Sequence, residues 1–246
     1  MKETGAVAEG GGSTGEILSR RYHTLTGRPD HREPATRRVI FKAFARTLGP
    51  WLPADREVRV LDAGCGEGAL LAFLRERGFD RLAGFDLSPE NVGLCHAQGF
   101  GFVTEGDALK LAEVSGEYDA IFSLDLLEHL PKERAAEFLG AARGKLAPGG
   151  VLILQTPNMG YLLAAFHRYS DLTHQWGVTE VSVRVLLRAA GFDDARIEIR
   201  PAWNATTLLG RLREAYLRAL HLAITFIEGS YRPRIPTKNL LVRARR

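Results

Sequence analysis

The chain has 246 residues, of which 45% are hydrophobic and 25% are charged, with a net charge of +4, 26 glycines, 11 prolines and two cysteines. A chain of this length can bury a sizeable core without a disulfide or a metal, which excludes a disordered chain, a collagen-like chain and a disulfide-framed secreted module. No run approaches the roughly 18 apolar residues of a membrane span, and the N-terminal residues lack the apolar core of a secretory signal. We therefore expect a cytoplasmic protein with a flexible leader over residues 1–20 and a single domain over residues 21–246.

Short apolar runs alternate with amphipathic segments along most of the chain. Helices are expected over residues 33–48, 69–77, 88–98, 131–146, 179–190 and 206–227. Strands are expected over residues 58–61, 81–85, 100–104, 118–123, 151–154, 197–200 and 239–242. This alternation is typical of a parallel sheet covered by helices on both faces, with ligands bound beyond the carboxyl ends of the strands.

The loop after the first strand is rich in glycine. Glycine occupies every second position from Gly64 through Gly66 to Gly68, between a predicted strand and a predicted helix. These glycines let the backbone approach a ligand closely. The spacing satisfies the loose dinucleotide pattern G-x-G-x-x-G/A, so an NAD-dependent oxidoreductase is one interpretation. However, Asp62 and Glu67 would crowd a pyrophosphate, whereas they suit a ligand that carries an ammonium or sulfonium cation.

Two further carboxylates follow the next strands. Asp86 ends the second strand, where a carboxylate can accept hydrogen bonds from both hydroxyls of a ribose. Asp107 follows the third strand, where it could accept from an exocyclic amine. The sequence therefore favours a nucleoside-like ligand with a cationic group.

The segments V-L-D-A-G-C-G-E-G, F-D-L-S, G-D-A-L, Y-D-A-I-F-S-L-D-L-L-E-H-L and P-G-G-V-L-I-L-Q-T-P-N occur in this order. Over residues 56–200 the chain thereby resembles the class I S-adenosylmethionine (SAM)-dependent methyltransferases. The resemblance implies an α/β fold with a Rossmann-like, doubly wound, seven-stranded sheet of order 3-2-1-4-5-7-6, its last strand antiparallel. It also implies SAM as co-substrate. The predicted cofactor-binding residues are Asp62, Gly64, Cys65, Gly66, Asp86, Leu87, Asp107, Ala108 and Ser123.

A cluster of acids and histidines is expected just beyond the fourth strand. If the segment is helical, Asp125, Glu128 and His129 share one face, and His174 follows in a later loop. Carboxylates with imidazoles can hold a divalent cation, either Mg²⁺ or a transition metal, which would lower the pKa of an acceptor hydroxyl. The pattern D-x-x-E-H followed by Thr173-His174 resembles the E-x-x-E-H…H metal set of small-RNA 2′-O-methyltransferases and ubiquinone-pathway O-methyltransferases, with Asp125 in place of a glutamate.

The alternative is catalysis without a metal. An imidazole with an ordinary pKa near 6.5 suits proton removal, so His129 or His174 could act as a general base. Glu128 is the third candidate catalytic residue.

Two segments are candidates for contacts with partners. Residues 159–178 are longer than an ordinary connection between a strand and a helix. Their aromatic residues and histidines predict a lid over the methyl end of the cofactor. Residues 205–229 form a helical insert whose apolar stripe has i+4 spacing: Leu208, Leu212, Tyr216, Leu220 and Ile224. This stripe suits core packing or a dimer face, and alternatively a substrate wall or a weak peripheral membrane contact.

Basic residues concentrate near both ends of the chain. Residues 20–46 carry eight Lys or Arg against two acids, and residues 211–246 carry nine against two. They are scattered without interleaved aromatics, which favours a solvated surface over a nucleic-acid site. We therefore predict a monomer or homodimer that transfers a methyl group from SAM to a hydroxyl oxygen of a small molecule or glycan. RNA or other nucleic-acid 2′-O-methylation is the alternative acceptor chemistry.

Overall fold

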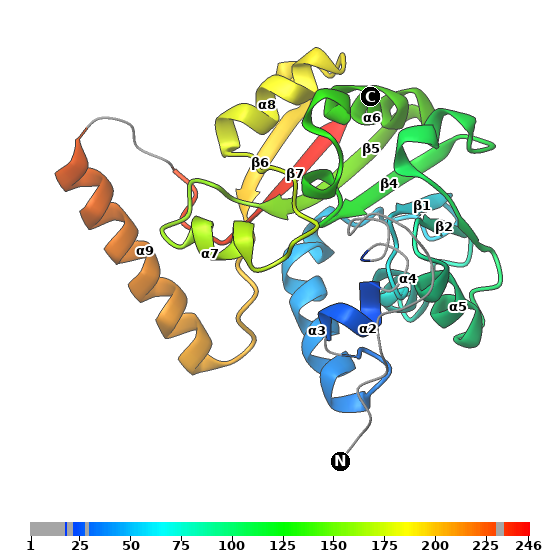
Figure 1. The fold of residues 1–246 in the computed structure, drawn as a ribbon, viewed down its shortest axis with the longest axis horizontal. Coiled ribbons are helices and arrows are strands. Elements are labelled where there is room, and N and C mark those ends of the chain that lie inside the picture. Colours follow the sequence, from blue (N-terminus) through cyan, green and yellow to red (C-terminus); the bar gives the residue numbers. More distant parts are fainter. Residues whose placement is uncertain (1–17, 19–21, 28–29, 230–233) are drawn as a thin grey trace.

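A computed structural model describes residues 18, 22–27, 30–229 and 234–246 (Figure 1). The predicted leader over residues 1–20 lies outside these residues except for Leu18. Seven strands form one sheet of order β3-β2-β1-β4-β5-β7-β6. β7 runs antiparallel to both of its neighbours, and the other pairings are parallel. The predicted sheet order and the antiparallel last strand are confirmed.

The elements alternate along the chain as expected. The strands are β1 (Val60–Ala63), β2 (Leu82–Asp86), β3 (Val103–Glu105), β4 (Tyr118–Leu124), β5 (Leu146–Pro157), β6 (Ile197–Pro201) and β7 (Asn239–Arg245). The α-helices are α2 (Tyr22–Thr26), α3 (Pro34–Thr47), α4 (Ala69–Arg75), α5 (Pro89–Ala97), α6 (Ala135–Lys145), α7 (Ala164–Tyr169), α8 (Glu180–Ala189) and α9 (Leu208–Glu228).

The two largest hydrophobic clusters of the described residues share the strands of the sheet, because successive side chains of a strand point to opposite faces. Leu152 and Leu154 of β5 belong to the core that contains residues of α6 and α8. Ile153 belongs to the other core, which contains Phe73 of α4 and the partly buried Phe44 of α3. Helices on both faces thus leave the carboxyl edge of the parallel strands for the site.

The apolar stripe of α9 does not pack on the core. Leu208 is 76% exposed and Tyr216 is 66% exposed, whereas the buried side chains of this helix are His221 and Thr225. Figure 1 shows α9 standing apart from the sheet and its covering helices. Core packing of the stripe is therefore wrong as an expectation. Among the described residues, no helix combines the length and the apolar character needed to span a bilayer.

Candidate active site

The glycine loop between β1 and α4 has a backbone that only glycine adopts readily. Gly64, Gly66 and Gly68 have φ values of 72°, 54° and 86°. The N–H of Gly66 donates to Asp86 Oδ2 at 2.8 Å, which ties the loop to the end of β2. A Cβ atom built at Gly66 would meet no atom within 4 Å. At Gly66 the backbone is therefore open to close approach by a ligand, whereas a Cβ at Gly64 or Gly68 would lie 3.0 Å from the side chain of Leu126 or Cys95.

A pocket of about 610 Å³ lies against this loop and the ends of β2, β3 and β4. All of the predicted cofactor-binding residues except Ser123 line it. Ser123 is buried, and its Oγ has no hydrogen-bond partner among the described residues. The volume is within the range of small-molecule and cofactor sites.

Asp62 is the most perturbed carboxylate of this pocket. Its side chain is buried, and its Oδ2 has no hydrogen-bond partner in the described part of the chain. Burial, and secondarily the charge of Asp86, raise the pKa of Asp62 to about 8. A buried carboxylate without a partner is unfavourable unless a cation offsets it. The sulfonium and ammonium groups of SAM would provide such a cation, so the pocket fits SAM.

We expect Asp62 to couple SAM binding to proton release. Because a cationic ligand binds the carboxylate form, binding near pH 7 must expel the proton that a pKa of about 8 retains. Calorimetry in buffers of different ionisation enthalpy should therefore show proton release for the wild type and little for Asp62→Asn. Equal release from both proteins would contradict this role of Asp62.

The same variant has a predicted effect on stability. The folded-state pKa of Asp62 lies above its ordinary value of 3.8, so the unfolded chain binds fewer protons than the unliganded fold between these two values. The stability of the unliganded fold therefore falls as pH rises from about 4 to about 8. Asp62→Asn should consequently raise the melting temperature at pH 8 and do so much less at pH 5. The result would show whether Asp62 lowers stability to favour cofactor binding.

The turn after β4 is not helical at Asp125. Asp125 has a φ of 53°, and a short 3-10 helix begins only at Leu127 and ends at His129. Asp125 therefore does not share a helix face with Glu128 and His129, and that expectation is wrong. Its carboxylate instead accepts hydrogen bonds from Gln155 Nε2 of β5, at 3.0 and 3.2 Å.

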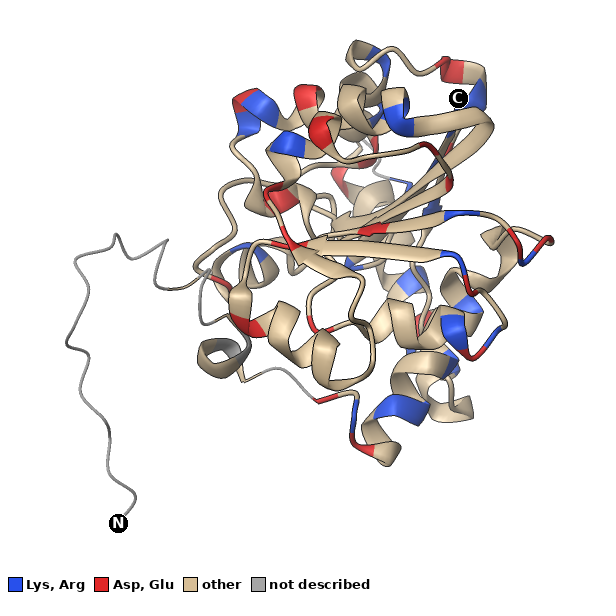
Figure 2. Ribbon diagram, turned by 90° about the vertical axis from the view of Figure 1, so that its right-hand side faces the viewer, with Lys and Arg blue, Asp and Glu red and all other residues tan. Residues whose placement is uncertain are grey.

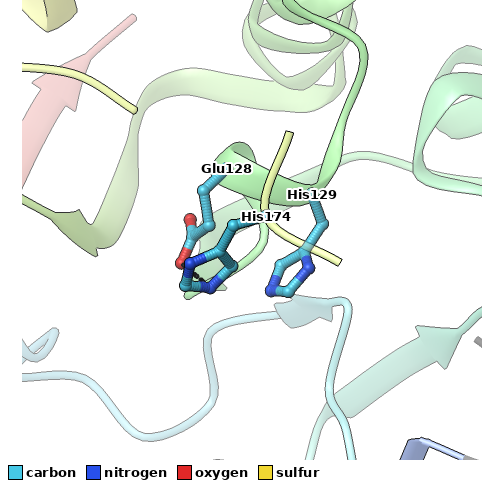
Figure 3. Close-up of side chains that lie close together, drawn as sticks. All are labelled: Glu128, His129 and His174. Atoms are coloured by element: carbon cyan, nitrogen blue, oxygen red, sulfur yellow. Dashed lines mark ion pairs between the residues drawn. The ribbon is translucent and has the colours of Figure 1, made fainter. Parts of the chain in front are cut away.

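Glu128, His129 and His174 converge from this turn and from the loop after α7 (Figure 3). Each offers one potential metal-ligand atom, and these atoms lie within 4.8 Å of one another. Glu128 is 1% exposed; its Oε2 accepts from Thr156 Oγ1 at 3.0 Å, and its Oε1 lies 3.9 Å from His174 Nε2. Asp125, the fourth predicted ligand, lies outside this group of three.

His174 is held in one orientation. Its Nδ1 lies 3.2 Å from the carbonyl oxygen of His167, which can only accept a hydrogen bond. Burial lowers the pKa of His174, although Asp171 opposes the effect. A neutral His174 ring therefore has its proton on Nδ1 and a lone pair on the Nε2 that faces Glu128.

A second pocket, of about 530 Å³, adjoins the first. Asp125, Leu172 and Thr173 line both pockets. Glu128 and His174 line the second pocket, whereas His129 lines the first. The acid and histidine cluster thus lies at the junction of a cofactor-sized pocket and a separate pocket.

Sequence reasoning missed Asp171 and Tyr22, and it named Thr173 only as the neighbour of His174 in the predicted metal motif. Thr173 Oγ1 lies 2.8 Å from His129 Nδ1 and donates to Asp171 Oδ1 at 2.6 Å, while Tyr22 donates to Asp171 Oδ2 at 2.7 Å. Burial by itself would raise the pKa of Asp171, but the hydrogen bonds from Thr173 and Tyr22 outweigh it and lower the pKa to about 2. The D-x-T-H pattern was a local signal for Asp171, but nothing local marks Tyr22, which is 149 residues away from it.

The family model of a methyltransferase domain matches residues 31–197. The chain is similar to the ubiquinone biosynthesis O-methyltransferase of Azorhizobium caulinodans, with 30% identity over 176 residues, which cover 64% of this chain and 67% of that protein. This chain is a class I SAM-dependent methyltransferase. SAM is therefore its co-substrate, and the dinucleotide interpretation of the glycine loop is set aside.

A further relative of this methyltransferase and a solved structure with a similar fold are named for different acceptors. A tRNA U34 carboxymethyltransferase of Pseudoalteromonas translucida is 26% identical over 151 residues, which are 56% of this chain and only 46% of that protein. A SAM-dependent methyltransferase structure from Archaeoglobus fulgidus has a TM-score of 0.65 at 23% identity, covering 85% of this chain and 94% of that one. Magnesium protoporphyrin IX methyltransferase from Synechocystis PCC 6803, with bound SAM, has a TM-score of 0.57 at 20% identity, covering 97% and 100%.

Proposed function

We propose that this methyltransferase methylates a hydroxyl oxygen of a small molecule or glycan. The observation that carries the proposal is the junction of two pockets, with Glu128, His129 and His174 between them. When bound in the first pocket, SAM supplies an electrophilic methyl group. The chain positions an acceptor in the second pocket and removes the proton that the hydroxyl loses.

The second pocket supports a small acceptor. Its volume of about 530 Å³ suits a small molecule or a sugar unit. On the side of the molecule drawn in Figure 2, basic and acidic segments are interspersed rather than gathered into one basic surface. A nucleic-acid acceptor, which would require a basic path for the phosphates, is therefore the less favoured alternative.

The histidines support oxygen as the methylated atom. A neutral amine is already nucleophilic, whereas an alcohol or phenol needs help to lose its proton. His129 lines the cofactor pocket, and its Nδ1 is occupied by Thr173, so Nε2 is the nitrogen that can take up this proton. We propose His129 as the general base, with His174 and Glu128 beside it.

Catalysis through a divalent cation held by Glu128, His129 and His174 is a second candidate mechanism. Their potential ligand atoms lie within 4.8 Å of one another, and Nδ1 of each imidazole already has a hydrogen-bond partner. Asp125 lines the second pocket and is the additional acid near this set. A cation there would lower the pKa of the acceptor hydroxyl and orient it.

Chelation separates these two forms of catalysis. With a bound cation, dialysis against a chelator should abolish transfer, and added Mg²⁺ or Mn²⁺ should restore it. Glu128→Gln should then lose Mn²⁺, measured by electron paramagnetic resonance, while Glu137→Gln on the exposed face of α6 keeps it. Full activity in the presence of the chelator, together with no Mn²⁺ binding by the wild type, would contradict the cation and support general-base catalysis without a metal.

The acceptor class is tested with labelled SAM. The enzyme is incubated with [methyl-³H]SAM and panels of phenols, sugars, amines and RNA, and the products are located by mass spectrometry. The proposal expects transfer to a hydroxyl oxygen of a small molecule or glycan. Transfer exclusively to amines or to RNA would contradict it.

A further inference from the structure

We propose that Asp171 and Thr173 are positioning residues that fix the tautomer of His129, so that its Nε2 carries the lone pair at the junction of the two pockets. The inference rests on the proposed function, because it assigns a task to residues around the proposed base. It adds two side chains that do not themselves have to touch the reacting atoms.

The three side chains form a continuous hydrogen-bonded chain. His129 Nδ1 lies 2.8 Å from Thr173 Oγ1, and Thr173 Oγ1 lies 2.6 Å from Asp171 Oδ1. Asp171 Oδ1 also accepts from the backbone N–H of Thr173 at 2.9 Å, which fixes the carboxylate relative to the hydroxyl. On its other oxygen, Asp171 accepts from Tyr22 at 2.7 Å.

The number of protons determines the direction of this chain. A hydroxyl has one proton to donate, and a carboxylate can only accept. If Thr173 donates to Asp171, its oxygen can interact with His129 only by accepting a proton from Nδ1–H. A neutral His129 then has its lone pair on Nε2, in the form that can accept a proton or bind a cation.

The neighbouring imidazole shows the same arrangement through a different partner. His174 Nδ1 faces the carbonyl oxygen of His167, which is also purely an acceptor. The centroids of the two rings are 4.8 Å apart, and the ring planes meet at 69°. Both histidines are therefore held through Nδ1, which leaves Nε2 as the basic nitrogen in each neutral ring.

Three hydrogen bonds join the segment after Thr173 to the turn after β4. Gln175 donates from its backbone N–H to the Glu128 carbonyl at 2.9 Å, and its side chain donates to the His129 carbonyl at 2.7 Å. Trp176 Nε1 donates to the Leu130 carbonyl at 2.8 Å. The segment that carries Asp171 and Thr173 is therefore fastened to the turn that carries His129.

The test is the tautomer itself, measured on the full chain labelled with ¹⁵N-histidine. Long-range ¹H–¹⁵N spectra distinguish a protonated ring nitrogen from one with a lone pair, and loss of a signal in His129→Gln assigns it. At a pH where the ring is neutral, we expect Nδ1–H in the wild type and in Thr173→Ser, which keeps the hydroxyl. Thr173→Val and Asp171→Asn should shift His129 partly or wholly to Nε2–H.

The rate should follow the tautomer. With a hydroxyl acceptor identified by the labelled-SAM assay, methyl transfer at saturating SAM should fall at least about 10-fold in Thr173→Val and recover in Thr173→Ser. A wild-type His129 that is protonated on Nε2 would overturn the inference without any variant. Unchanged spectra in both disruptive variants would also overturn it. Failure of the wild type to transfer methyl to any hydroxyl would instead overturn the proposed function, and the tautomer would still decide the inference.

Discussion

Replacing Gly66 with valine should reduce the affinity for SAM by at least roughly 100-fold, about 2.7 kcal/mol, while the fold persists. A Cβ atom at this position would meet no protein atom within 4 Å, and Gly66 lines the first pocket. It would therefore occupy space that the ligand needs. Calorimetry with SAM and with its demethylated product measures the loss, and circular dichroism follows the fold.

The control for this variant must carry the same backbone strain. Gly66 has a φ of 54°, which a β-branched residue adopts only with strain. Gly116 has a φ of 84°, also has no atom within 4 Å of a built Cβ, and lies outside the first pocket. Gly116→Val should thus lose similar stability but keep SAM affinity. Retained affinity in Gly66→Val would mean that the glycine loop only turns the chain.

Replacing His129 with alanine should lower the rate of methyl transfer by about 10²–10⁴-fold, the usual contribution of a positioned general base. SAM affinity should change much less, because the variant removes a proton acceptor and leaves the glycine loop and Asp86 intact. With a phenolic acceptor the deficit should shrink as pH approaches 10, where the phenol ionises by itself. Initial rates between about pH 6 and pH 10 measure both effects.

His96 provides a matched histidine outside the site. It lies exposed on α5, and its Nε2 is 2.8 Å from the Val103 carbonyl. His96→Ala should keep the wild-type rate at every pH. Wild-type rates in His129→Ala would show that proximity alone suffices for transfer and would reduce His129 to a neighbour of the cofactor.

Structural features that depend on residues close together in the chain could be predicted from the sequence. The buried strands appear as short apolar runs, and the glycine loop, Asp86 and Asp107 follow them directly. These residues line one pocket because parallel strands end at the same edge of the sheet. The strand order came with the resemblance to a family rather than from periodicity.

Features that depend on long-range contacts could not be predicted. β5 begins at Leu146, well before the predicted residue 151, because pairing with β4 begins there at Tyr118. No glycine marks the left-handed backbone at Asp125, and an aspartate adopts this conformation too rarely for its presence alone to predict it. The apolar stripe of α9 has helical periodicity, but periodicity does not say that Leu208 would remain exposed.

The most direct test of the central claim is a calorimetric titration of the wild-type protein with SAM, with its demethylated product and with NAD. For SAM and its demethylated product we predict micromolar-range dissociation constants, which correspond to a binding free energy of about −8 kcal/mol. We predict no binding of NAD. Absence of binding by SAM and its product, or tight binding of NAD alone, would contradict the assignment of the first pocket.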